Sequence, residues 1–136
     1  MEKILIKTAV LPTDLKILIV DDEIDICYLL SGILRQKNFR TTYVNTLSDT
    51  ELLLKKEEFS AVFLDNHLPD GLGIDFISYI KKYYPHIKVI MITANDTSAD
   101  RRKASNEGVD HFMGKPFTRD MVYEVVDTLV LNESKV

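Results

Sequence analysis

The sequence predicts a doubly wound α/β domain in which helices cover both faces of a five-stranded parallel sheet. Short apolar runs alternate along the chain with segments whose apolar residues recur at helical spacing. The runs at residues 17–20, 61–64 and 89–92 are continuously apolar, as strands buried on both faces of a parallel sheet are. The connecting helices, of about ten to fourteen residues, are long enough for right-handed crossovers between parallel strands.

The first half of the chain contains three predicted strands and two predicted helices. Asn38 ends the first helical pattern. Ser48 and Glu51 form a capping-box pattern, which predicts that the second helix begins at Ser48. The strands are expected at residues 16–20, 40–44 and 61–64, and the helices at residues 24–37 and 48–57.

The second half begins with a predicted turn at residues 68–71, where proline fixes one backbone angle and Gly71 permits a positive φ. Gly108 is expected to end a polar helix with few apolar residues, and Thr118 is expected to cap the last helix. The remaining strands are expected at residues 87–92 and 110–113, and the helices at residues 74–83, at residues 98–107 and after Thr118.

Composition and charge indicate one compact domain. With 136 residues, of which 46% are hydrophobic and 28% charged, the chain can bury a core and cover it with a charged surface. The formal net charge of -4 argues against direct nucleic-acid binding, which needs clustered basic side chains. The expected organisation is an N-terminal leader over residues 1–15, the domain over residues 16–131 and a C-terminal tail over residues 132–136.

The expected location is cytoplasmic. Cys27 is the only cysteine, so no internal disulfide can form, which fits a reducing compartment. No apolar stretch approaches the ~20 residues that span a bilayer, and the first residues lack the apolar core of a signal peptide. We therefore expect no contact with a membrane.

Polar residues stand where the predicted strands end. Asp21 and Asp22 follow the first strand, while Asp65, Thr93 and Lys115 follow the third, fourth and fifth. Because parallel strands end at one edge of the sheet, these side chains are expected to meet where open α/β folds bind ligands. Clustered carboxylates repel one another and require a cation. Oxygen ligation without a cysteine or histidine cluster favours Mg²⁺, with Mn²⁺ as an alternative, and predicts phosphate chemistry.

This order of motifs resembles the receiver domain of response regulators, the two-component signalling proteins that include the chemotaxis regulators. The matching motifs are Asp21-Asp22, Asp65 within DNHLPDGLG, Thr93-Ala94 and Lys115-Pro116-Phe117. The resemblance extends over about residues 16–131. It implies a flavodoxin-like (βα)5 receiver fold with strand order 2-1-3-4-5, and a site at the switch point between strands one and three.

The resemblance also implies roles for the acidic residues. It makes Asp65 the phosphoacceptor, places Asp22 on Mg²⁺ and Asp21 on a metal-bound water, and assigns the backbone carbonyl of His67 to the metal. Each aspartate taken alone is also a good helix cap or turn residue. His67 is either a plain loop residue or one whose imidazole tunes hydrolysis. The occurrence of the motifs together favours the functional interpretation.

Further residues are implied to bind and sense the phosphoryl group. Thr93 and Lys115 would bind its oxygens, and the bond between Lys115 and Pro116 is commonly cis in the family. Phe112 corresponds to an aromatic residue that changes rotamer on phosphorylation, and Ala94 leaves room for its inward position. Ordinary core packing of Phe112 is the alternative.

The expected function is signalling rather than turnover of a substrate. A histidine kinase or a histidine phosphotransfer protein would phosphorylate Asp65, and the acyl phosphate would hydrolyse slowly. The phosphorylated form would bind a downstream protein or a second copy through its fourth helix, fifth strand and fifth helix. The alternatives are an aspartate-nucleophile phosphohydrolase, whose nucleophile follows the first strand, and a flavodoxin, whose flavin phosphate Asp21 and Asp22 would repel.

Overall fold

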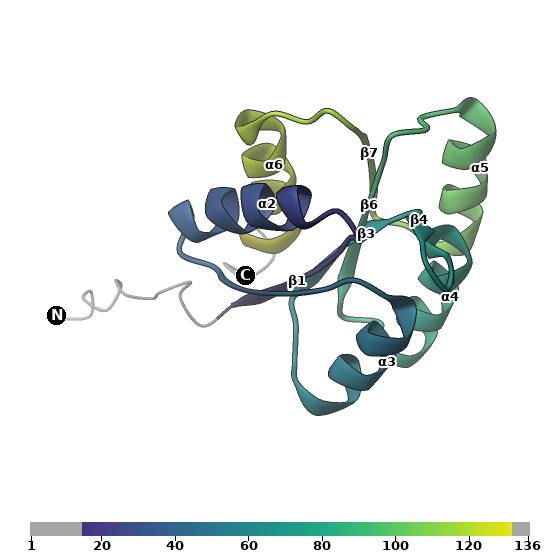
Figure 1. Cartoon of the computed structure of the whole chain (residues 1–136), viewed down its shortest axis with the longest axis horizontal. Coiled ribbons are helices and arrows are strands. Elements are labelled where there is room, and N and C mark those ends of the chain that lie inside the picture. Colours follow the sequence, from purple (N-terminus) through teal and green to yellow (C-terminus); the bar gives the residue numbers. More distant parts are fainter. Residues whose placement is uncertain (1–14, 132–136) are drawn as a thin grey trace, which may run out of the picture.

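The main sheet has the predicted strand order. The computed structural model describes residues 15–131, and its five parallel strands lie in the order β2-β1-β3-β6-β7 (Figure 1). They are β1 (Lys16–Val20), β2 (Arg40–Val44), β3 (Ala61–Asp65), β6 (Lys88–Thr93) and β7 (His111–Gly114). Apart from the short β4 and β5, this is the order 2-1-3-4-5. The doubly wound, flavodoxin-like fold is therefore confirmed. The expected leader, apart from Leu15, and the expected tail lie outside the described residues.

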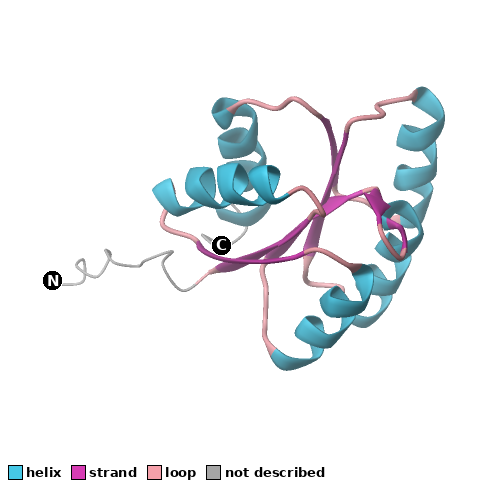
Figure 2. Cartoon of the chain, in the orientation of Figure 1, coloured by secondary structure: helices cyan, strands magenta, loops and turns pink. Residues whose placement is uncertain are grey.

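Helices cover both faces of the sheet, as Figures 1 and 2 show. One face carries α2 (Ile24–Gln36) and α6 (Arg119–Val126), which a π-helical turn, η3 (Asp127–Leu131), extends. The other carries α3 (Leu47–Lys56), α4 (Gly73–Tyr83) and α5 (Ser98–Glu107). Over residues 15–131, no helix is long and apolar enough to cross a membrane.

Alternate residues of β1 divide the interior into two cores. Ile17 and Ile19 pack in the core under α2 and α6, whereas Leu18 and Val20 pack in the core under the other helices. All four side chains are fully buried. This strand is thereby held by packing on both faces, and so is the position of Asp21 at its carboxyl end.

Threonine side chains cap three of the helices. Thr118 caps α6, as predicted, by accepting a hydrogen bond from the backbone N–H of Met121. The prediction that Ser48 caps α3 is wrong, because the cap is Thr46, whose hydroxyl accepts from the N–H of Asp49. The N–H of Ser48 instead donates to the carboxylate of Asp70, which lies in a neighbouring loop. The helix therefore starts with a Thr46 cap and a contact to Asp70, and not with the Ser48–Glu51 capping box.

The turn after β3 is a short hairpin that the sequence did not predict. β4 (His67–Leu68) pairs antiparallel with β5 (Gly71–Leu72), and α4 begins directly afterwards (Figure 2). Gly71 has a φ of 152°, so the positive φ expected there is confirmed. At two residues each, these strands are too short for periodicity to reveal them.

Helix α5 is the polar helix that the sequence predicts. Ala104 is its one buried residue, and Gly108 ends it in the left-handed conformation with φ 100°, as expected. The helix therefore rests on little apolar surface compared with α4, which buries Ile74, Ile77 and Ile80.

Candidate functional site

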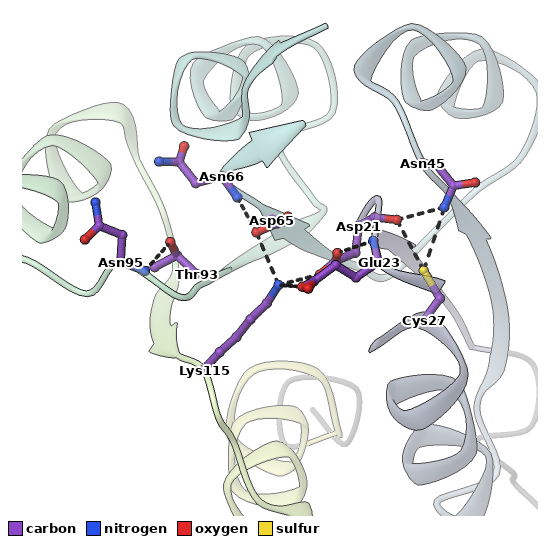
Figure 3. Close-up of polar contacts among 9 residues, drawn as sticks. All are labelled: Asp21, Glu23, Cys27, Asn45, Asp65, Asn66, Thr93, Asn95 and Lys115. Atoms are coloured by element: carbon purple, nitrogen blue, oxygen red, sulfur yellow. Dashed lines mark hydrogen bonds and ion pairs between the residues drawn. The ribbon is translucent and has the colours of Figure 1, made fainter. Parts of the chain in front are cut away.

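The polar residues at the strand ends meet at one edge of the sheet. Asp65 ends β3 and Thr93 ends β6, while Asp21 and Lys115 directly follow β1 and β7. Figure 3 shows Lys115 reaching between Asp65 on one side and Asp21 with Glu23 on the other. The predicted convergence of these residues is therefore present in the structure.

Asp65 is a buried carboxylate at the centre of this edge. Asp65 is 5% exposed, and its Oδ1 accepts a hydrogen bond of 2.9 Å from the N–H of Asn66. Burial and the charge of Asp21 raise the pKa of Asp65 to about 6, although Lys115 acts in the opposite direction. The carboxylate is thus largely ionised at neutral pH but protonated in mild acid.

Asp21 is fully buried beside it. Its Oδ1 accepts a hydrogen bond from the N–H of Glu23 at 2.8 Å. Its Oδ2 lies 3.0 Å from Nζ of Lys115 but accepts no well-aligned hydrogen bond. Burial raises the pKa of Asp21, because water no longer solvates the charged form. One oxygen of this carboxylate is therefore poorly satisfied.

Lys115 supplies the positive charge of the site. Its Nζ lies 2.8 Å from Glu23 Oε1, 3.0 Å from Asp21 Oδ2 and 3.5 Å from Asp65 Oδ1. Burial alone would lower the pKa of Lys115, but the hydrogen bond to Glu23 and the nearby charges of Asp21 and Asp65 outweigh it and raise the pKa. The lysine is thus charged throughout the pH range in which Asp65 titrates.

The acidic residues fit a hard divalent cation. Asp21, Asp22 and Asp65 each offer a carboxylate oxygen, and these atoms lie within 4.8 Å of one another. Asp21 Oδ2 is a buried oxygen with unused hydrogen-bonding capacity, and one lysine cannot balance three carboxylates. Oxygen-only ligands suit Mg²⁺ or Mn²⁺. Asp22 is exposed, which leaves the cluster open to solvent on its side.

Comparison with known proteins identifies the family. Residues 17–127 match the family model of the response regulator receiver domain. The chain belongs to this receiver family.

Two relatives show how the receiver occurs in longer and shorter proteins. This chain is 35% identical over 113 residues to the response regulator protein PilR of Pseudomonas aeruginosa, a match that covers 83% of the chain and 25% of PilR. It is 33% identical over 124 residues to the chemotaxis protein CheY-3 of Vibrio cholerae, with 89% of the chain and 95% of that protein covered. The chain thus spans a quarter of the length of PilR and nearly all of CheY-3.

Solved receiver structures have the same fold. A CheY-like receiver domain protein from Methanospirillum hungatei matches with a TM-score of 0.81 at 25% identity, covering 90% of this chain and 98% of that one. The beryllofluoride-activated NtrC4 receiver domain dimer matches with a TM-score of 0.81 at 32% identity, covering 86% of this chain and 97% of that one. The resemblance inferred from the motifs is therefore confirmed.

Of the residues expected to bind or sense the phosphoryl group, Thr93 ends β6, Ala94 follows it and Phe112 lies on β7, and their roles stay predictions. Thr93 is buried, and its hydroxyl accepts a hydrogen bond of 3.1 Å from the N–H of Asn95, while Ala94 is exposed. Phe112 is 9% exposed and lies beneath the guanidinium of Arg101, 4.7 Å from the ring centroid. Its position is inward, but core packing and a rotamer switch both remain compatible with it.

The remaining residues near the site include one confirmed prediction, one untested prediction and two residues that the sequence analysis missed. The Lys115-Pro116 bond is cis, as the resemblance implies. The His67 side chain is exposed on β4, and the role of its carbonyl stays a prediction. Sequence reasoning missed Glu23 and Asn66, whose buried Oδ1 accepts from the N–H of Ile74 at 2.9 Å. The only sequence signal for both was their position next to predicted site residues.

Proposed function

We propose that this receiver accepts a phosphoryl group on Asp65 from a histidine kinase or a histidine phosphotransfer protein. The observation that carries the proposal is the placement of the Asp65 carboxylate between an acidic cluster and Lys115, which lies 3.5 Å away. A nucleophilic carboxylate needs a nearby cation to admit an anionic phosphoryl group. Lys115 supplies one cation, and a divalent ion held by the acidic cluster would supply a second.

In the transfer step, an ionised oxygen of Asp65 attacks the phosphorus of a phosphohistidine. A phosphorus–oxygen bond forms, the phosphorus–nitrogen bond breaks, and the imidazole nitrogen keeps the electron pair. Asp21, Asp22 and Asp65, with the backbone carbonyl of His67, would hold Mg²⁺ or Mn²⁺, whose charge offsets that of the phosphoryl oxygens.

The chain's own donors then stabilise the product. Nζ of Lys115 and the hydroxyl of Thr93 flank Asp65 from β7 and β6, and both would donate to phosphoryl oxygens (Figure 3). Water attacking the same phosphorus would return the carboxylate and release inorganic phosphate slowly. The exposed His67 side chain, two residues from Asp65, either influences that water or is a plain loop residue, and the lifetime of the phosphorylated form in His67→Ala would distinguish the two.

The signal would leave through the face formed by α5, β7 and α6. A downstream protein or a second copy would distinguish the two states there, since the loops carrying Thr93 and Lys115 lead into these elements. The NtrC4 receiver, which is a dimer in its beryllofluoride-activated form, supports self-association as one mode. No external substrate is turned over in this proposal.

The test is phosphorylation with acetyl phosphate and Mg²⁺, followed by intact-protein mass spectrometry. One added phosphoryl group, labile to hydroxylamine, is expected in the wild type and absent in Asp65→Asn. Asp25→Asn is the matched control, because Asp25 is an exposed aspartate in the first turn of α2. Full labelling of Asp65→Asn would reject the proposal.

A further inference from the structure

Glu23 holds the lysine of the site more closely than the proposed phosphoacceptor does. Lys115 Nζ lies 2.8 Å from Glu23 Oε1 and 3.5 Å from Asp65 Oδ1. Glu23 is the N-cap residue of α2, and its own N–H donates to Asp21 at 2.8 Å. The backbone of Glu23 is therefore anchored to the site, and the carboxylate of Glu23 accepts a hydrogen bond from the ammonium of Lys115 (Figure 3).

Glu23 differs from the other two partners of Lys115. Asp21 and Asp65 belong to the set of carboxylates whose oxygens lie within 4.8 Å of one another, and Glu23 does not. Its side chain is 61% exposed, and over residues 15–131 Lys115 is the cation that it contacts. When Asp21 and Asp65 are committed to a divalent ion, Glu23 is the carboxylate that still competes for the ammonium.

We propose that Glu23 is a positioning residue that holds Lys115 away from Asp65 until a phosphoryl group arrives. This inference rests on the proposed phosphorylation of Asp65. The phosphoryl oxygens then compete with Glu23 for the ammonium, so Glu23 opposes both the transfer and the retention of the phosphoryl group. The third residue of the Asp-Asp-Glu run thus sets how easily this receiver is activated.

The size of the effect follows from exposure. An ion pair with one largely exposed partner contributes little free energy, so removing it should change rates by about two- to fivefold. We expect Glu23→Gln to accelerate labelling by acetyl phosphate and to tighten beryllofluoride binding by this factor. Glu23→Asp, which keeps the charge, should restore much of the wild-type behaviour. Asp25→Asn, which removes a nearby charge without a contact to Lys115, should match the wild type.

A double-mutant cycle separates positioning from simple repulsion of the anionic donor. If Glu23 acts through the lysine, Glu23→Gln should have no effect on beryllofluoride affinity in a Lys115→Ala background. A general charge effect would persist in that background and would overturn the inference. The side-chain ¹⁵N resonance of Lys115, followed by NMR, should also shift in Glu23→Gln and not in Asp25→Asn.

The outcomes distinguish this inference from the proposed function. A wild type that acetyl phosphate does not label would reject the function itself. A labelled wild type with an equal or slower rate in Glu23→Gln would leave the function standing and reject the role of Glu23. An unshifted Lys115 resonance in Glu23→Gln would reject it as well.

Discussion

One ammonium group stands among four carboxylates at the receiver site. Asp21 and Asp65 are buried and have raised pKa values, whereas Asp22 and Glu23 are exposed. The carboxylates of Asp21 and Asp65 repel each other, so the site is electrostatically unfavourable without a bound cation. Binding of a cation, or the loss of one negative charge, reduces this repulsion. The uncompensated negative charge of this cluster therefore lowers the stability of the folded state.

The first prediction concerns stability and pH in the presence of EDTA. The pKa of Asp65 rises from an ordinary 3.8 to about 6, so the folded state holds its proton to a higher pH than the unfolded chain. Ionising Asp65 therefore lowers stability as the pH rises through this window. Asp65→Asn removes the loss and should stabilise the protein by about 3 kcal/mol at pH 7, because the pKa rises by about 2 units and each unit corresponds to about 1.4 kcal/mol.

Urea unfolding at several pH values measures this difference. The gain should shrink as the pH falls below about 6 and vanish below about pH 3, where the wild-type carboxyl is protonated in both states. Asp25→Asn, a change at an exposed aspartate, is the control. A gain in Asp65→Asn that grows toward acid would contradict the raised pKa.

The second prediction concerns the metal. Asp22 is exposed beside the buried pair, whereas Asp21 already contacts Lys115. Asp22→Ala should therefore weaken binding of Mg²⁺ or Mn²⁺ by at least about tenfold relative to the wild type. Asp21→Ala should weaken it less. Calorimetric titration checks this order, and unchanged affinity in Asp22→Ala would contradict the expected metal site.

Side chains that directly follow strands could be predicted from the sequence, whereas partners of exposed side chains could not. The direction of a strand fixes where Asp65 and Thr93 emerge, so their meeting required only a correct sheet. The contact of Glu23 with Lys115 joins residues 92 apart in sequence, and the rotamer of a 61% exposed glutamate decides it. No local pattern encodes such a choice.

At the scale of elements, the junction of β3 and α4 fixes the backbone of Asp65. The N–H of Gly73, the first residue of α4, donates to the carbonyl of Asn66 at 2.7 Å. A methyl group at Gly73 would overlap the carbonyl oxygen of Asp65. The helix therefore approaches the strand so closely that only glycine fits.

The third prediction compares two glycines. Gly73→Ala should destabilise the protein by about 2–4 kcal/mol, because the backbone of Asp65 must move, and should slow labelling of Asp65. Gly32→Ala is the matched control, since a methyl group there meets nothing within 4 Å on an exposed face of α2. That change should stabilise the helix by about 0.5–1 kcal/mol. Urea unfolding measures both, and an unaffected Gly73→Ala would contradict the close approach.

Elements were predicted well where apolar periodicity determines them and less well where a tertiary contact does. The long strands and helices follow from their buried residues. The start of α3 does not, because Asp70 reaches from a loop to the backbone N–H groups of Leu47 and Ser48 at 2.9 Å each. Polar loops of this kind carry no periodic signal.

On the scale of the whole molecule, a path of contacts joins the site to α5. The N–H of Lys115 donates to the carbonyl of Thr93 at 2.7 Å, which ties the loops after β6 and β7 together. Further along the first loop, Asp96 accepts hydrogen bonds of 2.7 and 2.9 Å from Arg101 of α5. Arg101 in turn covers Phe112 of β7. A movement at the phosphoryl site would therefore reach the α5 and β7 surface.

The fourth prediction tests this path by hydrogen exchange with and without beryllofluoride and Mg²⁺. Thr93 and Lys115 can both donate to the phosphoryl mimic only if their loops move inward, which should disturb the Asp96–Arg101 pair. Helix α5 should respond most, because Ala104 is its one buried residue. Exchange should therefore change across residues 94–115, and Asp65→Asn should show no change. A response confined to the loop after β3, with residues 94–115 silent, would contradict this path and mean that the signal leaves by another face.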